Sequence, residues 1–272
     1  MESSTSVKGH IVKPKALILQ AHGTNRDDDV AETLTLAGAE IECVPLNHLR
    51  ARRKRFADYQ MLALPGGFSY ADSLGAGKLL AIDLNTYFIE EINMFVQSGK
   101  AVIGICNGFQ ALIKSGVLPF GTATTESGVT LTYNAHGHFE CRWVTLKAVS
   151  QNCIWTRDLN ELIECPVAHG EGNFQTNSDF QLSAFVENHQ VALAYVCPNG
   201  SPAAGEYPFN PNGSIHDIAG ICNPQGNVLG LMPHPENHIH PFQHPHWTRG
   251  ISHNDGLALF KNGVRYTKNI SS

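Results

Sequence analysis

The pentapeptide Gly104-Ile105-Cys106-Asn107-Gly108 constrains the fold more than any other stretch of this chain. It ends the apolar run 101–105, which predicts a buried strand, and it opens an amphipathic helix that continues through Phe109. A residue at the tip of such a strand–turn–helix has a strained backbone, and its neighbours two places away must be small so that strand and helix can approach closely. Both neighbours are glycine here. The pattern therefore predicts an α/β unit that carries Cys106 at its tip.

The position of Cys106 favours a chemical role. Unpaired backbone N–H groups and the helix dipole at a helix N-terminus stabilise a thiolate, which is the form that attacks carbonyl carbons. A buried cysteine in a glycine-rich turn is the alternative interpretation if the pentapeptide is taken alone.

A base for such a nucleophile is predicted near the other end of the chain. The run 228–232 predicts a strand, and Pro233-His234-Pro235-Glu236 follows it. Two prolines favour an extended backbone, in which residues two apart point to the same side. We therefore expect His234 and Glu236 to lie side by side, as a base and its orienting carboxylate do. A surface His and Glu on a proline-rich loop is the alternative for this tetrapeptide alone.

A pair of glycines supplies candidate oxyanion donors. The run 61–64 predicts a third strand, which leads into Pro65-Gly66-Gly67-Phe68. Adjacent glycines allow backbone N–H groups to turn toward a ligand. One N–H from this loop and that of Asn107 would form an oxyanion hole. A plain tight turn is the alternative.

With these three motifs in order, the chain resembles the class I (triad) glutamine amidotransferases. Its motifs are most similar to the branch that serves as the glutaminase subunit of phosphoribosylformylglycinamidine synthase in purine biosynthesis. The resemblance extends from about residue 15 to residue 266. It rests on PGGFSYAD (65–72), GICNGFQ (104–110), PVAHGEG (166–172), NPNGS (210–214) and GLMPHPE (230–236).

The resemblance implies roles for individual residues. Cys106 would attack the side-chain amide of glutamine and give a glutamyl thioester and ammonia, with His234 as base and acid and Glu236 as its support. The implied oxyanion donors are Gly67 or Phe68, and Asn107. The implied contacts of bound glutamine are Gln110, Asn134 and Phe139.

The resemblance also implies partners. Ammonia would pass to a separate synthetase subunit that uses ATP and Mg²⁺ to convert formylglycinamide ribonucleotide to formylglycinamidine ribonucleotide. The resemblance also allows a third small subunit. No cofactor or metal is expected in this chain itself. The stretch 169–172 is a candidate for part of the partner-contacting surface, and a turn with a satisfied histidine is its alternative.

Two features depart from the family pattern. His136 and His138 stand where a serine and an arginine are expected in an Asn-x-Ser-Gly-Arg-Phe-like stretch, which leaves the glutamine contact there open. The segment 237–254 resembles an extension of longer members and is rich in histidine. Its prolines give no regular ligand spacing, so we expect these histidines to cap or pack, and a transition-metal site is the alternative.

The order of elements predicts the fold class. Strands at 15–19, 41–44, 61–64 and 101–105 alternate with helices, and such βα units form a mostly parallel central sheet flanked by helices, as in flavodoxin-like folds. Strands at 142–146 and 191–195 predict an antiparallel extension. Helices are expected from Asp27 to about Gly38, from about 83 to 97, and at 254–262 with Gly263 as its end. The basic run 50–55 is expected to form a solvated helix face.

Composition excludes several classes of protein. The net charge of −5 over 272 residues does not suggest a nucleic-acid binder. Seven cysteines without close pairs favour reduced thiols and a cytoplasmic location. Residues 1–14 predict a flexible tail with neither a signal peptide nor a membrane span, and 15–272 one amidotransferase domain.

Other functions remain as alternatives. A cysteine hydrolase of the DJ-1/PfpI type would act without a synthetase partner, but it would lack the late Pro-His-Pro-Glu. A non-catalytic subunit of the same fold would be expected to lose Cys106, His234 or Glu236. The glutaminase subunit of another amidotransferase is the nearest alternative, and the Asn-Gly-Phe-Gln and Asn-Pro-Asn-Gly-Ser stretches argue against it.

Overall fold

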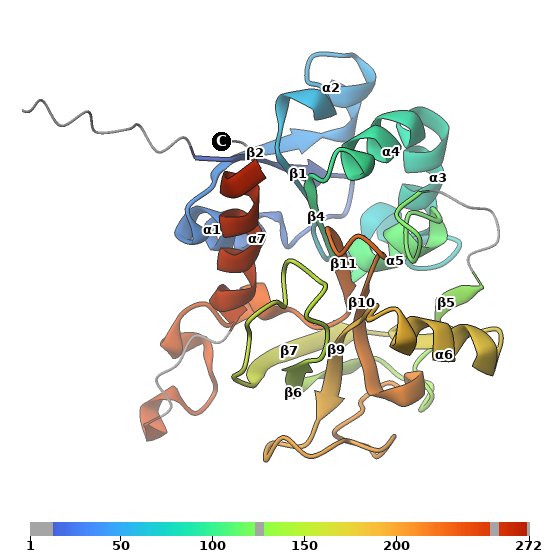
Figure 1. Ribbon diagram of the computed structural model, residues 1–272, viewed down its shortest axis with the longest axis vertical. Coiled ribbons are helices and arrows are strands. Elements are labelled where there is room, and N and C mark those ends of the chain that lie inside the picture. The colour runs from blue at the N-terminus through green and yellow to red at the C-terminus, as the bar shows by residue number, and fades with distance from the viewer. Residues whose placement is uncertain (1–12, 123–127, 251–255, 271–272) are drawn as a thin grey trace, which may run out of the picture.

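The computed structural model describes residues 13–122, 128–250 and 256–270, and a nine-stranded sheet runs through them (Figure 1). Five neighbouring strands are parallel: β2 (Glu40–Pro45), β1 (Lys15–Gln20), β3 (Met61–Leu64), β4 (Ala101–Ile105) and β11 (Val228–Leu231). Four antiparallel strands continue the sheet beyond β11: β10 (Ile218–Cys222), β9 (Val191–Val196), β6 (Glu140–Ala148) and β7 (Ile163–His169). The predicted fold class is therefore confirmed.

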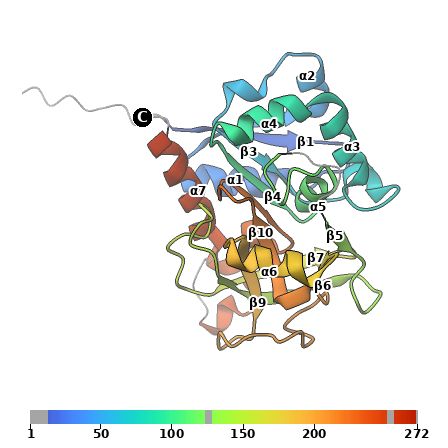
Figure 2. The ribbon, with the colours of Figure 1, turned by 45° about the vertical axis from the view of Figure 1, so that its right-hand side comes forward.

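Helices cover both faces of the parallel part (Figures 1 and 2). Helices α1 (Asp27–Ala37) and α7 (Gly256–Ile270) pack together on one face, and α3 (Lys78–Tyr87) and α5 (Asn107–Lys114) pack together on the other. The remaining elements are α2 (Leu46–Arg50), α4 (Ile89–Gln97), α6 (Asp179–Glu187) and a two-stranded sheet of β5 (Val129–Thr132) and β8 (Asn173–Thr176). Short 3-10 turns occur at Phe56–Asp58, Pro235–Asn237, Pro241–Gln243 and Trp247–Arg249, and turns with left-handed residues occur at Ser69–Asp72 and Ile215–Asp217.

Burial along the strands follows from this layering. Every residue of β3, β4 and β11 is buried, because helices cover the sheet on both sides there. Strand β7 alternates between buried and half-buried residues, as expected for a strand that faces the core on one side. A continuous apolar run in the sequence thus indicates a strand covered on both faces. An alternating run indicates a strand covered on one face.

The first predicted helix is confirmed at both ends. Helix α1 has three aspartates in its first turn, where their charge complements the helix dipole. Gly38 has a φ of 99° and follows the last helical residue, and its N–H donates to the carbonyl of Thr35 (3.0 Å). Only glycine adopts this left-handed conformation without strain.

The helix predicted at 83–97 is two helices. Helix α3 begins earlier than predicted, at Lys78, and Phe88 separates α3 from α4 with a φ of −137°. The Phe88 side chain is buried, and its ring meets that of Phe56 edge to face at 5.6 Å. The chain thus leaves the helical conformation at the residue whose ring is buried. The helical pattern of the sequence does not reveal this break.

The basic run 50–55 is a turn and not a helix face, so that prediction is wrong. Helix α2 ends at Arg50, and Arg52 has a φ of 54°. Lys54 pairs with Glu42 and Arg55 with Asp58. Local ion pairs on a tight turn therefore account for this cluster of charge.

The closing helix does not end at Gly263, because α7 continues to Ile270. Gly263 instead faces the buried Trp155: a Cβ at this position would lie 2.2 Å from Cζ3 of the indole. The glycine permits close approach of helix and indole and does not cap the helix. The predicted first residues of this helix, 254 and 255, and the predicted tail up to residue 12 lie outside the described residues.

Two further observations concern the environment of the chain. All seven cysteines are free thiols. Among the residues that the structure describes, no helix combines the length and apolar character that crossing a bilayer requires.

We predict that Gly263→Ala destabilises the protein. Alanine favours a helix over glycine by about 1 kcal/mol, but a Cβ at 2.2 Å from the indole places the overpacking cost in the upper part of its usual range, about 2–3 kcal/mol, so we expect a net loss of about 1–2 kcal/mol in the free energy of unfolding. Chemical denaturation of the variant and of Lys261→Ala, an exposed control on the same helix, measures this. An alanine variant as stable as the wild type would contradict the close contact.

Candidate active site

The turn at Cys106 has the predicted strained geometry. Cys106 lies between β4 and α5 with φ 50° and ψ −104°. A Cβ on Gly104 would lie 2.9 Å from the backbone of Gly108, and one on Gly108 would lie 2.0 Å from the carbonyl oxygen of Leu64. Any side chain at either glycine would push helix and strand apart. The requirement for small residues two places on either side of Cys106 is therefore confirmed.

The two glycine-loop donors considered from the sequence differ in availability. The N–H of Phe68 donates to the carbonyl of Gly23 (3.0 Å), whereas the N–H of Gly67 makes no hydrogen bond within the described part of the chain. Asn107 is the first residue of α5, where a backbone N–H has no partner inside the helix. Gly67 lines the same cavity as Cys106, and Asn107 follows Cys106 in the chain, so both offer backbone N–H groups to the site.

The Asn107 side chain connects the nucleophile turn to the loop that follows β3. Its Oδ1 accepts from the hydroxyl and the N–H of Ser69. Its Nδ2 donates to Oδ1 of Asp72 (2.8 Å) and to Oε1 of Gln110 (3.1 Å). Only the backbone of Asn107 was predicted to serve the site, although Ser69 and Asp72 belong to the PGGFSYAD motif.

His234 and Glu236 form a buried pair. Nδ1 of His234 lies 2.7 Å from Oε1 of Glu236, and the two residues are 3 % and 1 % exposed. The predicted pairing is confirmed, but the reason given for it is wrong. Pro235–Asn237 is a 3-10 turn, closed by the N–H of Asn237 on the carbonyl of His234 (3.1 Å), so a tight turn brings the two side chains together and not an extended backbone.

The charge state of His234 follows from its surroundings. Burial disfavours the imidazolium, but the Glu236 carboxylate and the negative charge of a Cys106 thiolate outweigh burial and raise the pKa of His234 to about 10. His234 is therefore protonated at neutral pH when Cys106 is ionised. Nδ1 of His234 is taken by Glu236, which leaves the buried Nε2 to interact with the side chain of Cys106. The Cys106 thiol also donates to the carbonyl of Ala168 (3.6 Å).

A small cavity of about 150 Å³ opens beside Cys106. This volume is below the range of about 300–1,000 Å³ typical of sites for drug-sized ligands, so it suits a small metabolite. Phe68 and Phe139 stack at its rim with ring centroids 6.4 Å apart. The residues that line it are Gly67, Phe68, Asp72, Ala76, Cys106, Gln110, Tyr133, Phe139, Ala168, His169, Gly170 and Glu171.

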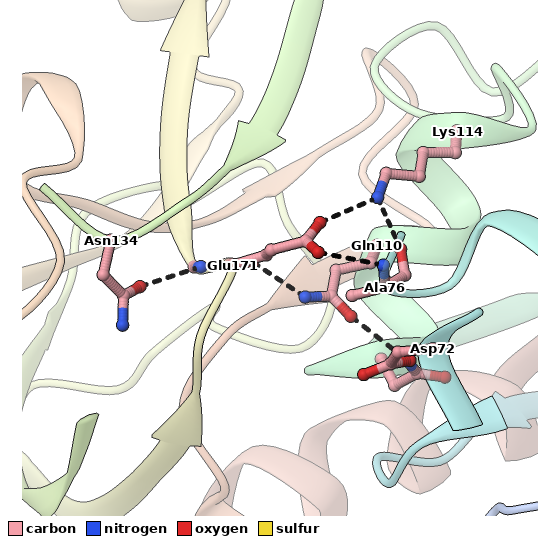
Figure 3. Close-up of polar contacts among 8 residues, drawn as sticks. Asp72, Ala76, Gln110, Lys114, Asn134 and Glu171 are labelled. Atoms are coloured by element: carbon pink, nitrogen blue, oxygen red, sulfur yellow. Dashed lines mark hydrogen bonds and ion pairs between the residues drawn. The ribbon is translucent and has the colours of Figure 1, made fainter. Parts of the chain in front are cut away.

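Gln110 and Glu171 join opposite walls of this cavity (Figure 3). Nε2 of Gln110 donates to the backbone carbonyl of Glu171 (2.7 Å). The Glu171 carboxylate accepts from the N–H of Ala76 (3.1 Å) and pairs with Lys114 (3.2 Å). Both amide atoms of Gln110 already have partners in the protein, so Gln110 supports the shape of the cavity that it lines.

Asn134 lies behind the cavity wall and not on it. Its Nδ2 donates to the carbonyls of His138 (3.0 Å) and His169 (2.8 Å), which leaves Oδ1 to accept from Gly172 N–H (3.0 Å) and from the His169 ring (3.0 Å). His169 must therefore carry its proton on Nδ1. Burial, with a contribution from His234, lowers the pKa of His169 to about 3, so the ring is neutral.

His169 is 2 % exposed and lines the cavity, so it is not part of an exposed docking surface in this chain. For the stretch 169–172, the hypothesis of a partner-contacting surface is therefore wrong for this histidine. The alternative was a turn with a histidine whose hydrogen bonds are satisfied. Nδ1 of His169 does have a partner, but Nε2 is buried without one among the described residues.

The other histidines that the structure describes lie outside the cavity lining. His138 pairs with Glu140 (2.8 Å), and the His136 ring packs against Tyr207 (4.6 Å). In the proline-rich extension, the rings of His238 and His244 pack edge to face on Trp143, and His240 caps a 3-10 turn. Within the described segments no three His, Cys, Asp or Glu side chains are arranged to hold a metal ion, and His253 lies outside them.

Comparisons with known proteins agree with this geometry. Residues 13–267 match the family model described as a CobB/CobQ-like glutamine amidotransferase domain. The chain is 56 % identical over 241 residues to phosphoribosylformylglycinamidine synthase subunit PurQ of Treponema denticola, covering 84 % of this chain and 89 % of the relative. It is 42 % identical over 262 residues to the protein of that name from Dehalococcoides mccartyi, covering 95 % and 99 %.

Solved structures are also similar to this chain. A chain of the structure of PurLQS from Thermotoga maritima is 32 % identical, with a TM-score of 0.72 and coverage of 94 % of this chain and 99 % of that one. A glutamine amidotransferase from Thermotoga maritima, 14 % identical with a TM-score of 0.51 and coverage of 96 % of this chain and 95 % of that one, shares the fold.

We predict that Glu236→Gln lowers the pKa of His234 by at least one unit from about 10, because burial then opposes protonation without the carboxylate. The raised pKa stabilises the folded state fully below the ordinary value of 6.5, and this stabilisation is lost as pH rises through about 10. NMR titration of the imidazole nitrogens in both proteins measures the shift. An unchanged titration midpoint in the variant would contradict the role assigned to Glu236.

Proposed function

The chain belongs to the CobB/CobQ-like glutamine amidotransferase family, and from this premise we propose that it is the glutaminase subunit of a phosphoribosylformylglycinamidine synthase. One observation carries the proposal most directly. A strained cysteine at a helix N-terminus interacts with a buried His–Glu pair and lines a small cavity. The relatives named PurQ, of which the chain covers 89 % and 99 %, support the specific enzyme.

Cys106 is the nucleophile in this proposal. Its thiolate attacks the carboxamide carbon of glutamine, and the N–H groups of Gly67 and Asn107 stabilise the negative charge that develops on the carboxamide oxygen. His234 gives its proton to the departing nitrogen, so ammonia leaves and a glutamyl thioester remains. A water molecule then attacks the thioester while His234 accepts its proton, and glutamate and the Cys106 thiolate are released.

The three proposed substrate contacts act in different ways. Phe139 closes the cavity rim with Phe68 and contacts the substrate directly. Gln110 lines the cavity and spans from Asn107 to Glu171, so it also fixes the distance between the two walls. Asn134 acts as a positioning residue, because it reaches the cavity only through His169 and Gly172.

Ammonia serves a synthetase subunit in this proposal. That subunit binds ATP and Mg²⁺ and amidates formylglycinamide ribonucleotide, so this chain needs no cofactor of its own. The likeness to a chain of PurLQS from Thermotoga maritima supports an assembly with a synthetase subunit, and we propose a third, small subunit in the same assembly. Seven free thiols are consistent with action in the reducing cytoplasm.

We predict that Cys106→Ser abolishes glutamine-dependent synthesis but leaves synthesis from ammonium salts intact. A hydroxyl is a weaker nucleophile than a thiolate, whereas the amidation site lies on the synthetase subunit. Formation of formylglycinamidine ribonucleotide by the reconstituted complex, with glutamine or with ammonium chloride, measures both activities. Glutamine-supported activity above a few per cent of wild type would refute the assignment of Cys106.

We also predict that the synthetase subunit, with its nucleotide ligands, raises glutaminase kcat/KM at least about tenfold, which equals about 1.4 kcal/mol of transition-state stabilisation. The rim residues Phe68, Tyr133 and Phe139 are 45 %, 72 % and 49 % exposed, so the cavity mouth is uncovered in the isolated chain. Closure by a partner would exclude water and fix the Gly67 donor. Steady-state glutamate release with and without the partner tests this, and full activity of the chain alone would contradict it.

A further inference from the structure

The cavity must recognise the end of glutamine that does not react. Once the carboxamide lies at Cys106, the substrate presents an α-ammonium and an α-carboxylate to the remaining lining. Among the lining residues two have carboxylate side chains, Asp72 and Glu171, and none is lysine or arginine. The α-carboxylate must therefore be bound by neutral donors, and the lining offers two candidates for the α-ammonium.

Glu171 is already compensated. Lys114 lies 3.2 Å from one carboxylate oxygen, and the N–H of Ala76 donates to the other (3.1 Å) (Figure 3). This ion pair is about four-fifths buried on both sides, so it is weakly screened. The charge of Glu171 therefore has a protein partner before any substrate arrives.

Asp72 has no such partner. Its Oδ1 accepts from the neutral amide of Asn107 (2.8 Å), and no ion pair joins it to any described residue. Burial raises the pKa of Asp72, and the nearby charge of Glu171 adds to this effect, while hydrogen bonds from the Asn107 side chain and the Gly77 backbone and the charge of Lys114 oppose it. A cation in the cavity would remove this penalty.

Asp72 ends a strained backbone segment. Tyr70, Ala71 and Asp72 have φ values of 56°, 55° and 51°, a left-handed run that is uncommon for tyrosine and alanine and more accessible to aspartate. Such strain persists only where surrounding contacts determine it, and it gathers at functional sites. Here the Asn107 side chain bonds both Ser69 and Asp72 and so fixes the two ends of the strained segment.

A second lining residue indicates a ligand with N–H donors. Nε2 of His169 has a lone pair, because the proton of this neutral ring is on Nδ1. The atom is buried and accepts no hydrogen bond from the described residues. Buried acceptors are almost always satisfied in native proteins, so a ligand that brings N–H groups into this cavity would complete the site.

We propose that Asp72 is a specificity-determining residue whose carboxylate binds the α-ammonium group of glutamine. This inference rests on the proposed glutaminase function and adds to it the group that distinguishes an α-amino acid from its desamino analogue. Glu171 and Lys114 hold the opposite wall, so Asp72 is the negative charge available to the substrate.

The test compares glutamine with glutaramate, which is glutamine without its α-amino group. Asp72→Asn keeps an oxygen for Asn107 but removes the charge. Asp27→Asn is the matched control, because Asp27 is also half-buried, also accepts from a neutral amide, that of Gln20, and lies outside the cavity lining. Glutaminase kinetics are measured for both variants and wild type with the synthetase subunit present.

For Asp72→Asn we expect KM for glutamine to rise about tenfold to a hundredfold, as for loss of a charge-assisted hydrogen bond, with kcat changed less than about threefold. The kcat/KM for glutaramate, low in wild type, should stay the same. The preference for glutamine over glutaramate should then fall by the same factor as the rise in KM, and Asp27→Asn should match wild type.

An equal loss on both substrates would overturn the proposal, because it would show that Asp72 only maintains the loop. If Asp72→Asn does not fold, Asp72→Ser is tested in the same way. The wild-type enzyme also provides a test without any substitution, because equal kcat/KM for glutamine and glutaramate overturns the proposal. Absence of turnover of either substrate by the wild-type complex would instead refute the proposed function.

Discussion

The close packing of α5 on β3 and β4 is the constraint on which the site depends. A Cβ on Gly108 would lie 2.0 Å from the carbonyl oxygen of Leu64, so strand and helix backbones touch there without side chains between them. This contact lets Cys106 adopt a φ of 50° and places the first N–H groups of α5 beside the sulfur. It also brings the Asn107 side chain within reach of Ser69, and so the loop after β3 is fixed by the same helix that carries the nucleophile.

Sheet topology explains why residues far apart in the chain meet. Strand β4 pairs in parallel with β3 on one side and with β11 on the other. Gly67, Cys106 and His234 follow the carboxyl ends of these three neighbouring strands, and ligand sites in open α/β sheets form at that edge. Cys106 and His234 are far apart along the chain but close in space, because the strands that precede them are adjacent.

Much of this could be predicted from the sequence, and the errors at Phe88 and Gly263 share a cause. The glycines around Cys106 and the cap at Gly38 depend on their immediate neighbours, so local pattern was enough. Phe88 and Gly263 were misjudged because distant aromatic rings decide their roles: Phe56 for the first and Trp155 for the second. The family resemblance connected Asn134 with the site. Its place behind the cavity wall could not be predicted, because long-range contacts determine that place.

The two buried histidines near the cavity show how partners determine the function of one residue type. His234 has a carboxylate partner, and its pKa rises to about 10, whereas His169 has the neutral amide of Asn134, and its pKa falls to about 3. The first can carry a proton to the departing nitrogen, and the second stays an uncharged acceptor throughout. Because the positive charge on His234 itself disfavours protonation of His169, the two states reinforce each other. Of the two, His234 alone is therefore able to deliver a proton at neutral pH.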